Sequence, residues 1–110
     1  MRRLALLAAV CALAGPARAD VFSVMVKSNP NVFTPTEITI KPGDGISWAW
    51  VDSTLPHSST SDASVWDSGI HTGPFRFRRP FPNAGDYPYY CVLHGAPGGV
   101  GMSGIIHVVP

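Results

Sequence analysis

Proline and glycine interrupt this chain so often that little room is left for a long helix. The 110 residues contain eleven of each, and the segments between them are short, rich in β-branched and aromatic residues, and without a helical period. These segments predict strands at residues 21–27, 32–33, 37–40, 46–51, 58–65, 75–81, 87–91 and 103–109. About seven to eight short strands joined by turns predict an all-β fold, an antiparallel sandwich, with a closed barrel as the alternative.

The N-terminus has the pattern of a secretory signal peptide. Two arginines follow the first methionine, an apolar run comes next, and residues 17–19 read A-x-A in one-letter terms. The apolar run is too short to span a bilayer. We therefore expect residues 1–19 to be a signal peptide that is removed, and residues 20–110 to form one exported domain with no membrane span. In a Gram-negative bacterium this domain would be periplasmic.

Loss of the signal peptide changes the charge of the domain. The full chain has eight basic and seven acidic residues, whereas residues 20–110 keep five basic and seven acidic ones. A net charge of about −2 argues against a polybasic nucleic-acid surface. The small cluster at Arg76, Arg78 and Arg79 is typical of a solvated strand edge.

A single cysteine is left in the expected domain, because Cys11 belongs to the signal peptide. In an oxidising compartment an unpaired cysteine is buried, paired between chains or chemically used. Cys91 is followed three residues later by His94, and a thiolate with an imidazole forms a pair of metal ligands. His57, beyond a tryptophan-rich segment, and Met102, in a glycine-rich stretch, complete a set of four candidate ligands.

The types of these ligands favour copper over zinc. Zinc binds thiolates and imidazoles but gains little from a thioether. Two histidines and one cysteine with a weak axial methionine form the blue-copper arrangement, which suits both Cu(I) and Cu(II). We predict one copper ion bound by His57, Cys91, His94 and Met102, and electron transfer as the function.

Several stretches between residues 33 and 109 match a known family pattern. They are Phe33-Thr34-Pro35, Glu37-Ile38-Thr39-Ile40, Pro42-Gly43-Asp44, Trp48-Ala49-Trp50, Pro56-His57, and Gly85-Asp86-Tyr87-Pro88-Tyr89-Tyr90-Cys91 with His94. In these stretches the chain resembles the plastocyanin-type cupredoxins. The resemblance implies a small Greek-key β-sandwich with type 1 copper at one end, which carries single electrons between larger redox proteins. It also implies the same four ligands.

Two positions depart from the family pattern. Seven residues separate His94 from Met102, which is more than is usual, but four of them are glycines that allow the backbone to fold back. Ser58 stands where similar proteins often carry an asparagine that ties the two ligand loops together. Serine has the shorter reach, so the surroundings of the ligands are expected to differ.

The other histidines and tyrosines are expected to have structural roles. His71 lies in a turn-rich stretch and is expected to be exposed to solvent, whereas His107 is expected to pack on a strand face. Tyr87 follows Gly85 and Asp86 in a sequence that resembles a tyrosine corner. Tyr90, next to Cys91 and directed outward, is a candidate electron port.

The predicted function is that of a soluble electron carrier, with buffering or delivery of copper as the alternative. An enzyme is not expected, because no spare cluster of histidines indicates a second metal. We expect a monomer that docks near His94 on a redox partner, such as a cytochrome or copper oxidase, through a small interface with little electrostatic steering. The expected docking surface consists of small apolar residues: Leu55, Pro56, Ala96, Pro97 and Val100.

Overall fold

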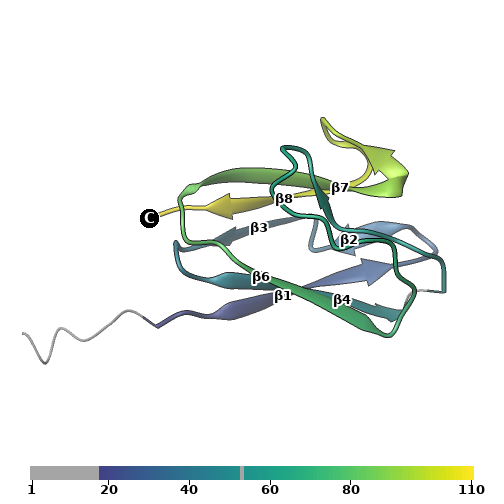
Figure 1. The fold of residues 1–110 in the computed structure, drawn as a ribbon, viewed down its shortest axis with the longest axis horizontal. Coiled ribbons are helices and arrows are strands. Elements are labelled where there is room, and N and C mark those ends of the chain that lie inside the picture. The colour runs from purple at the N-terminus through teal and green to yellow at the C-terminus, as the bar shows by residue number, and fades with distance from the viewer. Residues whose placement is uncertain (1–17, 53) are drawn as a thin grey trace, which may run out of the picture.

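Two four-stranded sheets face each other in the computed structural model, which describes residues 18–52 and 54–110. The expected signal peptide lies outside these residues except for its last two positions. The first sheet has the order β2-β1-β4-β6 and the second the order β3-β8-β7-β5; Figure 1 shows β3, β7 and β8 above β1, β4 and β6. The strands are β1 (Val21–Lys27), β2 (Val32–Thr34), β3 (Glu37–Ile40), β4 (Gly45–Asp52), β5 (Thr60–Ser61), β6 (Phe75–Pro80), β7 (Gly85–Ala96) and β8 (Val100–Val108).

The predicted all-β sandwich is confirmed, with one difference in the pairing of its strands. β1 pairs with β4 in parallel, as does β3 with β8, and the remaining pairs are antiparallel. β2 and β3 are separated by only two residues but belong to different sheets. The chain therefore crosses between the sheets and returns as β4 beside β1, instead of forming a hairpin with its neighbour in sequence. Among the described residues, no helix is long and apolar enough to cross a membrane.

The core lies between the two sheets. The sequence predicts that Ile46, Trp48 and Trp50 share one face of their strand, and all three are fully buried. Trp48 of the first sheet meets Tyr89 of the second edge to face, with ring centroids 5.4 Å apart. This aromatic contact joins the two layers beneath the site described below.

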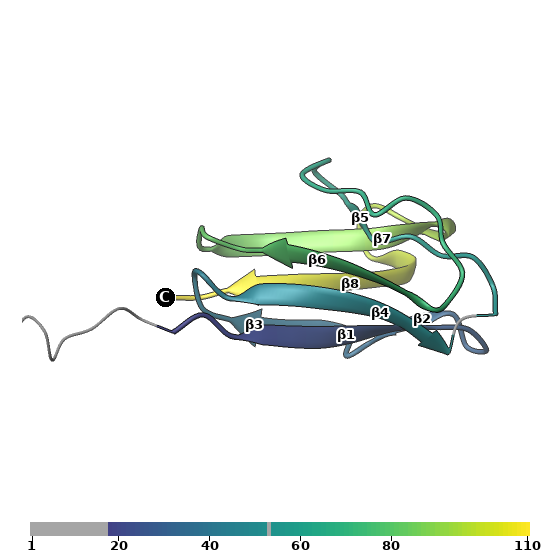
Figure 2. The ribbon, with the colours of Figure 1, turned by 60° about the horizontal axis from the view of Figure 1, so that its bottom comes forward.

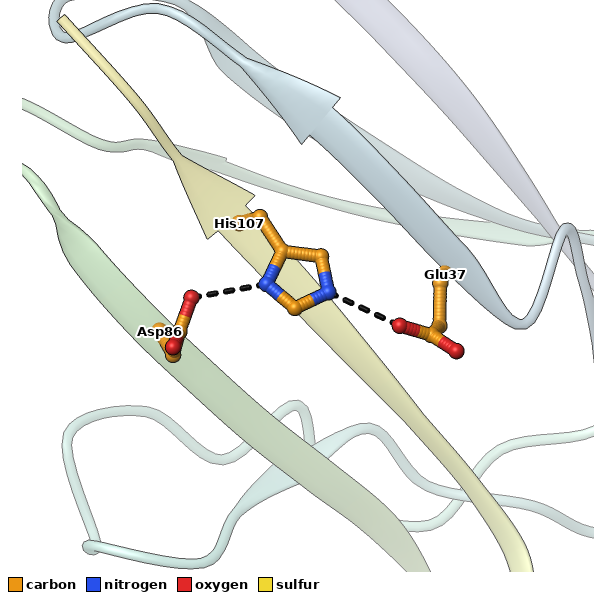
Figure 3. Close-up of polar contacts among 3 residues, drawn as sticks. All are labelled: Glu37, Asp86 and His107. Atoms are coloured by element: carbon orange, nitrogen blue, oxygen red, sulfur yellow. Dashed lines mark hydrogen bonds and ion pairs between the residues drawn. The ribbon is translucent and has the colours of Figure 1, made fainter.

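Three polar contacts stabilise the second sheet. The Tyr87 hydroxyl donates to the carbonyl oxygen of Asn83 at 2.8 Å, as a tyrosine corner does. On the outer face, His107 of β8 lies between Glu37 of β3 and Asp86 of β7 (Figure 3), with its two ring nitrogens 2.8 and 2.7 Å from the carboxylates. His107 therefore joins three neighbouring strands, in agreement with its expected structural role.

Glu37 and Asp86 also set the charge of His107. Hydrogen bonds to Glu37 and then Asp86 raise the pKa of His107 above its ordinary value. A neutral imidazole has only one N–H, so both contacts are favourable hydrogen bonds only when the ring is protonated. The geometry thus favours a cation at this position.

Candidate metal centre

Three of the four predicted ligands meet at one end of the sandwich. The Nδ1 atoms of His57 and His94 are 3.1 Å apart, and the Cys91 Sγ lies 3.8 Å from the first and 3.5 Å from the second. The three ligand atoms all lie within 4.8 Å of one another. His57 and Cys91 are fully buried, whereas His94 is partly exposed. The group is therefore closed on the protein side and reaches solvent through the His94 ring.

These distances suit a single bound metal ion. Metal–nitrogen bonds of about 2.0 Å and metal–sulfur bonds of about 2.3 Å would hold such ligand atoms roughly 3 to 4 Å apart. The same imidazole nitrogen, Nδ1, points inward on both rings, so neither ring would have to turn over. Two imidazoles and one thiolate in this arrangement fit a type 1 copper site, which confirms the predicted cofactor.

The His57 ring is held in place from several sides. Its Nε2 lies 2.9 Å from the hydroxyl of Ser28, which also accepts the backbone N–H of Leu55. With Nδ1 left for the metal, Nε2 carries the ring proton and donates it to Ser28. Trp50 adds a hydrogen bond from its indole N–H to the His57 carbonyl oxygen. A ligand whose second nitrogen is bonded in this way is fixed in both tautomer and orientation.

The electrostatic surroundings keep His57 neutral. Burial lowers the pKa of His57, and the neighbouring His94 ring lowers it further. A metal ligand must offer a lone pair, so a neutral imidazole is the form that the site needs. His57 thus has the protonation state of a ligand before any metal binds.

His71 anchors the loop that carries His57, a role that the sequence did not indicate. The two residues exchange backbone N–H to carbonyl hydrogen bonds, each 2.9 Å long. The His71 ring stacks on Phe75 with centroids 3.6 Å apart, and its Nε2–H donates to the Ser68 carbonyl oxygen at 2.9 Å. The expectation that His71 is exposed to solvent is wrong, because this packing leaves it half-buried. The turn residues before His71 give no sign of its β-bridge to His57, which forms only in the folded chain.

Cys91 and His94 lie in an irregular part of the β7–β8 pair. The register passes from Tyr90 opposite Ser103 to Gly95 opposite Gly101. Residues 91–94 of β7 therefore face a single residue of β8, Met102. Such bulges re-aim side chains and are common beside functional sites. Here the bulge turns Cys91 and His94 toward His57.

The stretch between His94 and Met102 is a tight hairpin. β7 continues to Ala96, and β8 begins at Val100, so the strand predicted at residues 87–91 is longer than expected. Gly101 has a φ of +63°, and an added Cβ there would collide with the His94 carbonyl oxygen. The glycine-rich stretch thus folds back as expected.

Met102 is buried beside the ligand group. Its side chain is 3% exposed and forms part of the core cluster that contains Cys91. Its backbone lies against Gly95, next to His94. Burial and position agree with an axial ligand, and the assignment stays a prediction.

Ser58 connects the two ligand loops despite its short side chain. Its backbone N–H donates to the Cys91 Sγ at 3.5 Å, and its hydroxyl oxygen accepts the N–H of Val92 at 3.0 Å. Serine therefore makes a connection where the family pattern often has asparagine. The hydroxyl reaches because residues 58–61 run directly alongside β7; Figure 2 shows β5 beside β7.

Comparisons with known proteins agree with this fold. No protein-family model matches the chain. A chloroplast plastocyanin of Tetradesmus obliquus is 29% identical over 80 residues, which cover 64% of this chain and 55% of that protein. The chain thus spans about half the length of that curated relative. The crystal structure of a pseudoazurin from Hyphomicrobium denitrificans has a TM-score of 0.65 at 21% identity, covering 80% of this chain and 74% of that one.

The fold is that of the cupredoxin class, and three candidate copper ligands converge at one end of it. Within that class, the sequence similarity to plastocyanin supports the more specific relationship that the residue pattern predicts. The chain is thus similar to a plastocyanin in sequence and to the cupredoxins in fold.

An enzyme also contains this fold. A copper-containing nitrite reductase from Thermus scotoductus has a TM-score of 0.65 at 23% identity, covering 90% of this chain but only 26% of the enzyme chain. The likeness therefore concerns one folding unit of a much larger protein and shows the fold alone.

Proposed function

We propose that this protein is exported and carries one electron at a time on a type 1 copper ion. His57, Cys91 and His94 would bind the ion through Nδ1, Sγ and Nδ1, with Met102 as the weak axial ligand. The observation that carries the proposal is the position of the buried Cys91 sulfur, 3.8 and 3.5 Å from two inward-pointing imidazole nitrogens.

Rigidity of the ligands is what the protein contributes to electron transfer. Bound copper supplies the exchange between Cu(I) and Cu(II). The hydrogen bond from His57 Nε2–H to Ser28 and the two hydrogen bonds between Ser58 and residues 91–92 hold the ligands in one arrangement. Because the ligands move little, a geometry acceptable to both oxidation states is kept and electron exchange needs little rearrangement.

The exposed end of the site suits brief docking to a redox partner. His94 is the ligand that reaches solvent, and the adjoining segments carry exposed apolar side chains: Leu55, Val92, Leu93 and Val100 are 38, 41, 50 and 56% exposed. Such a patch excludes water without requiring a large interface. We propose that a cytochrome or copper oxidase type of partner docks here, and that electrons pass through His94.

Copper delivery is the second candidate, and the burial of the ligands bears on it. Two of the three ligands are fully buried, which favours retention of the ion over its release. A carrier keeps copper through reduction and reoxidation, whereas a delivery protein gives it up to a competing site.

Copper loading of residues 20–110 tests the proposal directly. The Cu(II) form should show intense visible absorption from thiolate-to-copper charge transfer and a type 1 electron paramagnetic resonance spectrum. Several cycles of reduction and reoxidation in the presence of a copper chelator should leave the absorption unchanged. Loss of copper to the chelator on reduction would favour delivery, and a colourless Cu(II) protein would contradict both the site and the carrier function.

A further inference from the structure

A chain of hydrogen bonds runs from the ligand region to a carboxylate at the surface. The Ser58 hydroxyl, which accepts the Val92 N–H, lies 2.8 Å from the hydroxyl of Thr60. The Thr60 hydroxyl donates to Asp67 Oδ1 at 3.2 Å, and the same oxygen accepts the Gly69 N–H at 2.9 Å. Ser58 and Thr60 are buried, whereas Asp67 is exposed.

The directions of the two hydroxyl bonds in this series of hydrogen bonds follow from the last acceptor, Asp67. The carboxylate of Asp67 only accepts, so Thr60 donates its single hydroxyl proton there. The proton between Ser58 and Thr60 then comes from Ser58. The lone pairs of Ser58 are left for Val92, the residue that follows the thiolate ligand. Asp67 thus fixes the polarity of the two hydroxyl bonds, and the third bond, from the Val92 N–H to Ser58, ends on the backbone beside Cys91.

This series of hydrogen bonds also replaces regular β pairing beyond the end of β5. β5 pairs with β7 at Thr60 opposite Tyr90 and Ser61 opposite Tyr89. Past Thr60 toward the site, the Ser58 N–H turns to the Cys91 sulfur instead of a carbonyl oxygen. The Val92 N–H turns to a side chain instead of the backbone. The ligand segment is therefore held here by side-chain hydroxyls whose orientation depends on Asp67.

We propose that Asp67 and Thr60 are positioning residues that set the properties of the copper site through Ser58. Their bonds hold Ser58 so that its N–H stays on the Cys91 sulfur and its oxygen stays on Val92. A hydrogen bond to the sulfur draws electron density from the thiolate and so favours Cu(I). Weakening the chain lets the thiolate donate more strongly to copper, which lowers the reduction potential. This inference rests on the proposed copper function.

Four variants separate the hydrogen-bond chain from simple charge and packing. Thr60→Val removes the hydroxyl while keeping the side-chain shape, and Thr60→Ser keeps the hydroxyl. Asp67→Ala removes the final acceptor at an exposed position, where folding is least affected. Asp67→Asn removes the charge but keeps an oxygen facing the two donors, the Thr60 hydroxyl and the Gly69 N–H.

The reduction potential and the hydrogen exchange of the Val92 amide are the two measurements. Thr60→Val and Asp67→Ala should lower the potential of the copper form, and both should make the Val92 amide exchange several-fold faster in the metal-free protein. Thr60→Ser should match the unchanged protein in both, and Asp67→Asn should differ less than Asp67→Ala. Equal values in Thr60→Val and Thr60→Ser would overturn the inference. Faster exchange with an unchanged potential would also overturn it, because the chain would then only support the fold.

The metal-free measurement keeps the two proposals apart. If the unchanged protein shows no charge-transfer absorption with copper, the proposed function fails, while Val92 exchange still reports on the hydrogen-bond chain. If the absorption is present and the four variants are indistinguishable from the unchanged protein, the proposed copper function is supported and the positioning role of Asp67 and Thr60 is contradicted.

Discussion

Two groups of residues built around histidine differ in almost every physical respect: a buried cluster and an exposed cluster. At one end His57 and His94 face each other and a sulfur atom in a largely buried site. On the outer face of the second sheet, His107 has a carboxylate at each ring nitrogen. Burial lowers the pKa of His57, whereas Glu37 and Asp86 raise that of His107. The same side chain is prepared as a neutral ligand in one place and as a cation in the other.

The difference shows what makes a histidine available to a metal. His107 already has partners for both nitrogens, so a metal would have to displace a hydrogen bond. His57 uses Nε2 for the hydrogen bond to Ser28, and its Nδ1 is directed at the His94 Nδ1 and the Cys91 sulfur. The buried cluster therefore directs three ligand atoms at one point where a cation could bind, whereas both nitrogens of His107 are engaged by carboxylates. The predictions below test this contrast.

Replacement of Cys91 should have the largest effect. Cys91→Ser removes the thiolate, so the visible charge-transfer absorption of the Cu(II) form should disappear completely. His107→Gln, in the exposed cluster, should keep the full absorption and serves as the control. Visible absorption that survives in Cys91→Ser would place the metal elsewhere.

Copper should stabilise the fold through the buried cluster alone. At a free copper concentration a thousandfold above the dissociation constant, binding to the folded state adds about 4 kcal/mol to the free energy of unfolding. His107→Gln should gain the same amount as the unchanged protein, and Cys91→Ser should gain less. Chemical denaturation with and without copper measures this difference. Equal stability in both conditions would argue against a preformed site.

Met102→Leu should raise the reduction potential while copper remains bound. Loss of the axial thioether destabilises Cu(II) relative to Cu(I) and so raises the potential. Methionine and leucine are similar in size, so the core stays packed. Met25→Leu changes a partly exposed methionine on β1 and should leave the potential unchanged. Voltammetry compares the variants, and identical potentials in both would place the axial ligand at another residue.

Ser28→Ala should weaken the orientation of His57. The buried Nε2–H would lose its acceptor, which costs about 1–3 kcal/mol of stability. Copper affinity should fall as well, because the ring is less firmly held. Ser28→Thr keeps a hydroxyl and is the matched comparison. A variant with unchanged stability and copper affinity would show that the hydrogen bond is dispensable.

The exposed cluster should produce a small dependence of stability on pH. The folded pKa of His107 lies above the ordinary value of about 6.5. Its stabilising contribution is therefore complete below that value and is lost as the pH rises through the folded pKa. His107→Gln should flatten this part of the stability curve of the metal-free protein. Solvent screening keeps the effect small, and curves of the same shape would show that the ion pairs contribute nothing.

Local patterns carried most of the fold prediction. Alternation in residues 46–51 correctly placed Ile46, Trp48 and Trp50 on one face of a strand, because the two faces are set by the chain itself, and the structure shows that this face is fully buried. The parallel pairing of β1 with β4 was missed, because partner choice depends on how the chain crosses between sheets. The length of β7 was also underestimated, since its last part is stabilised by the returning hairpin of β8.

Ligand chemistry explains why the centre was largely predictable. A lone cysteine with a nearby histidine and methionine is informative through residue type and spacing alone. His71 was misjudged because its anchoring of His57 is a backbone contact between residues fourteen positions apart, which no side-chain pattern encodes. Ser58 was expected to have a shorter reach than asparagine, and the close approach of residues 58–61 to β7 gives its hydroxyl a partner.

The sequence by itself determined the β class of the fold and the kinds of atom available to bind copper, because strand periodicity and donor chemistry are properties of single residues and their near neighbours. Only the tertiary structure decided that His57, Cys91 and His94 converge, which nitrogen of each ring faces inward, and which histidine is neutral. These properties depend on burial and on contacts between distant segments, and they arise only when the two sheets close on each other.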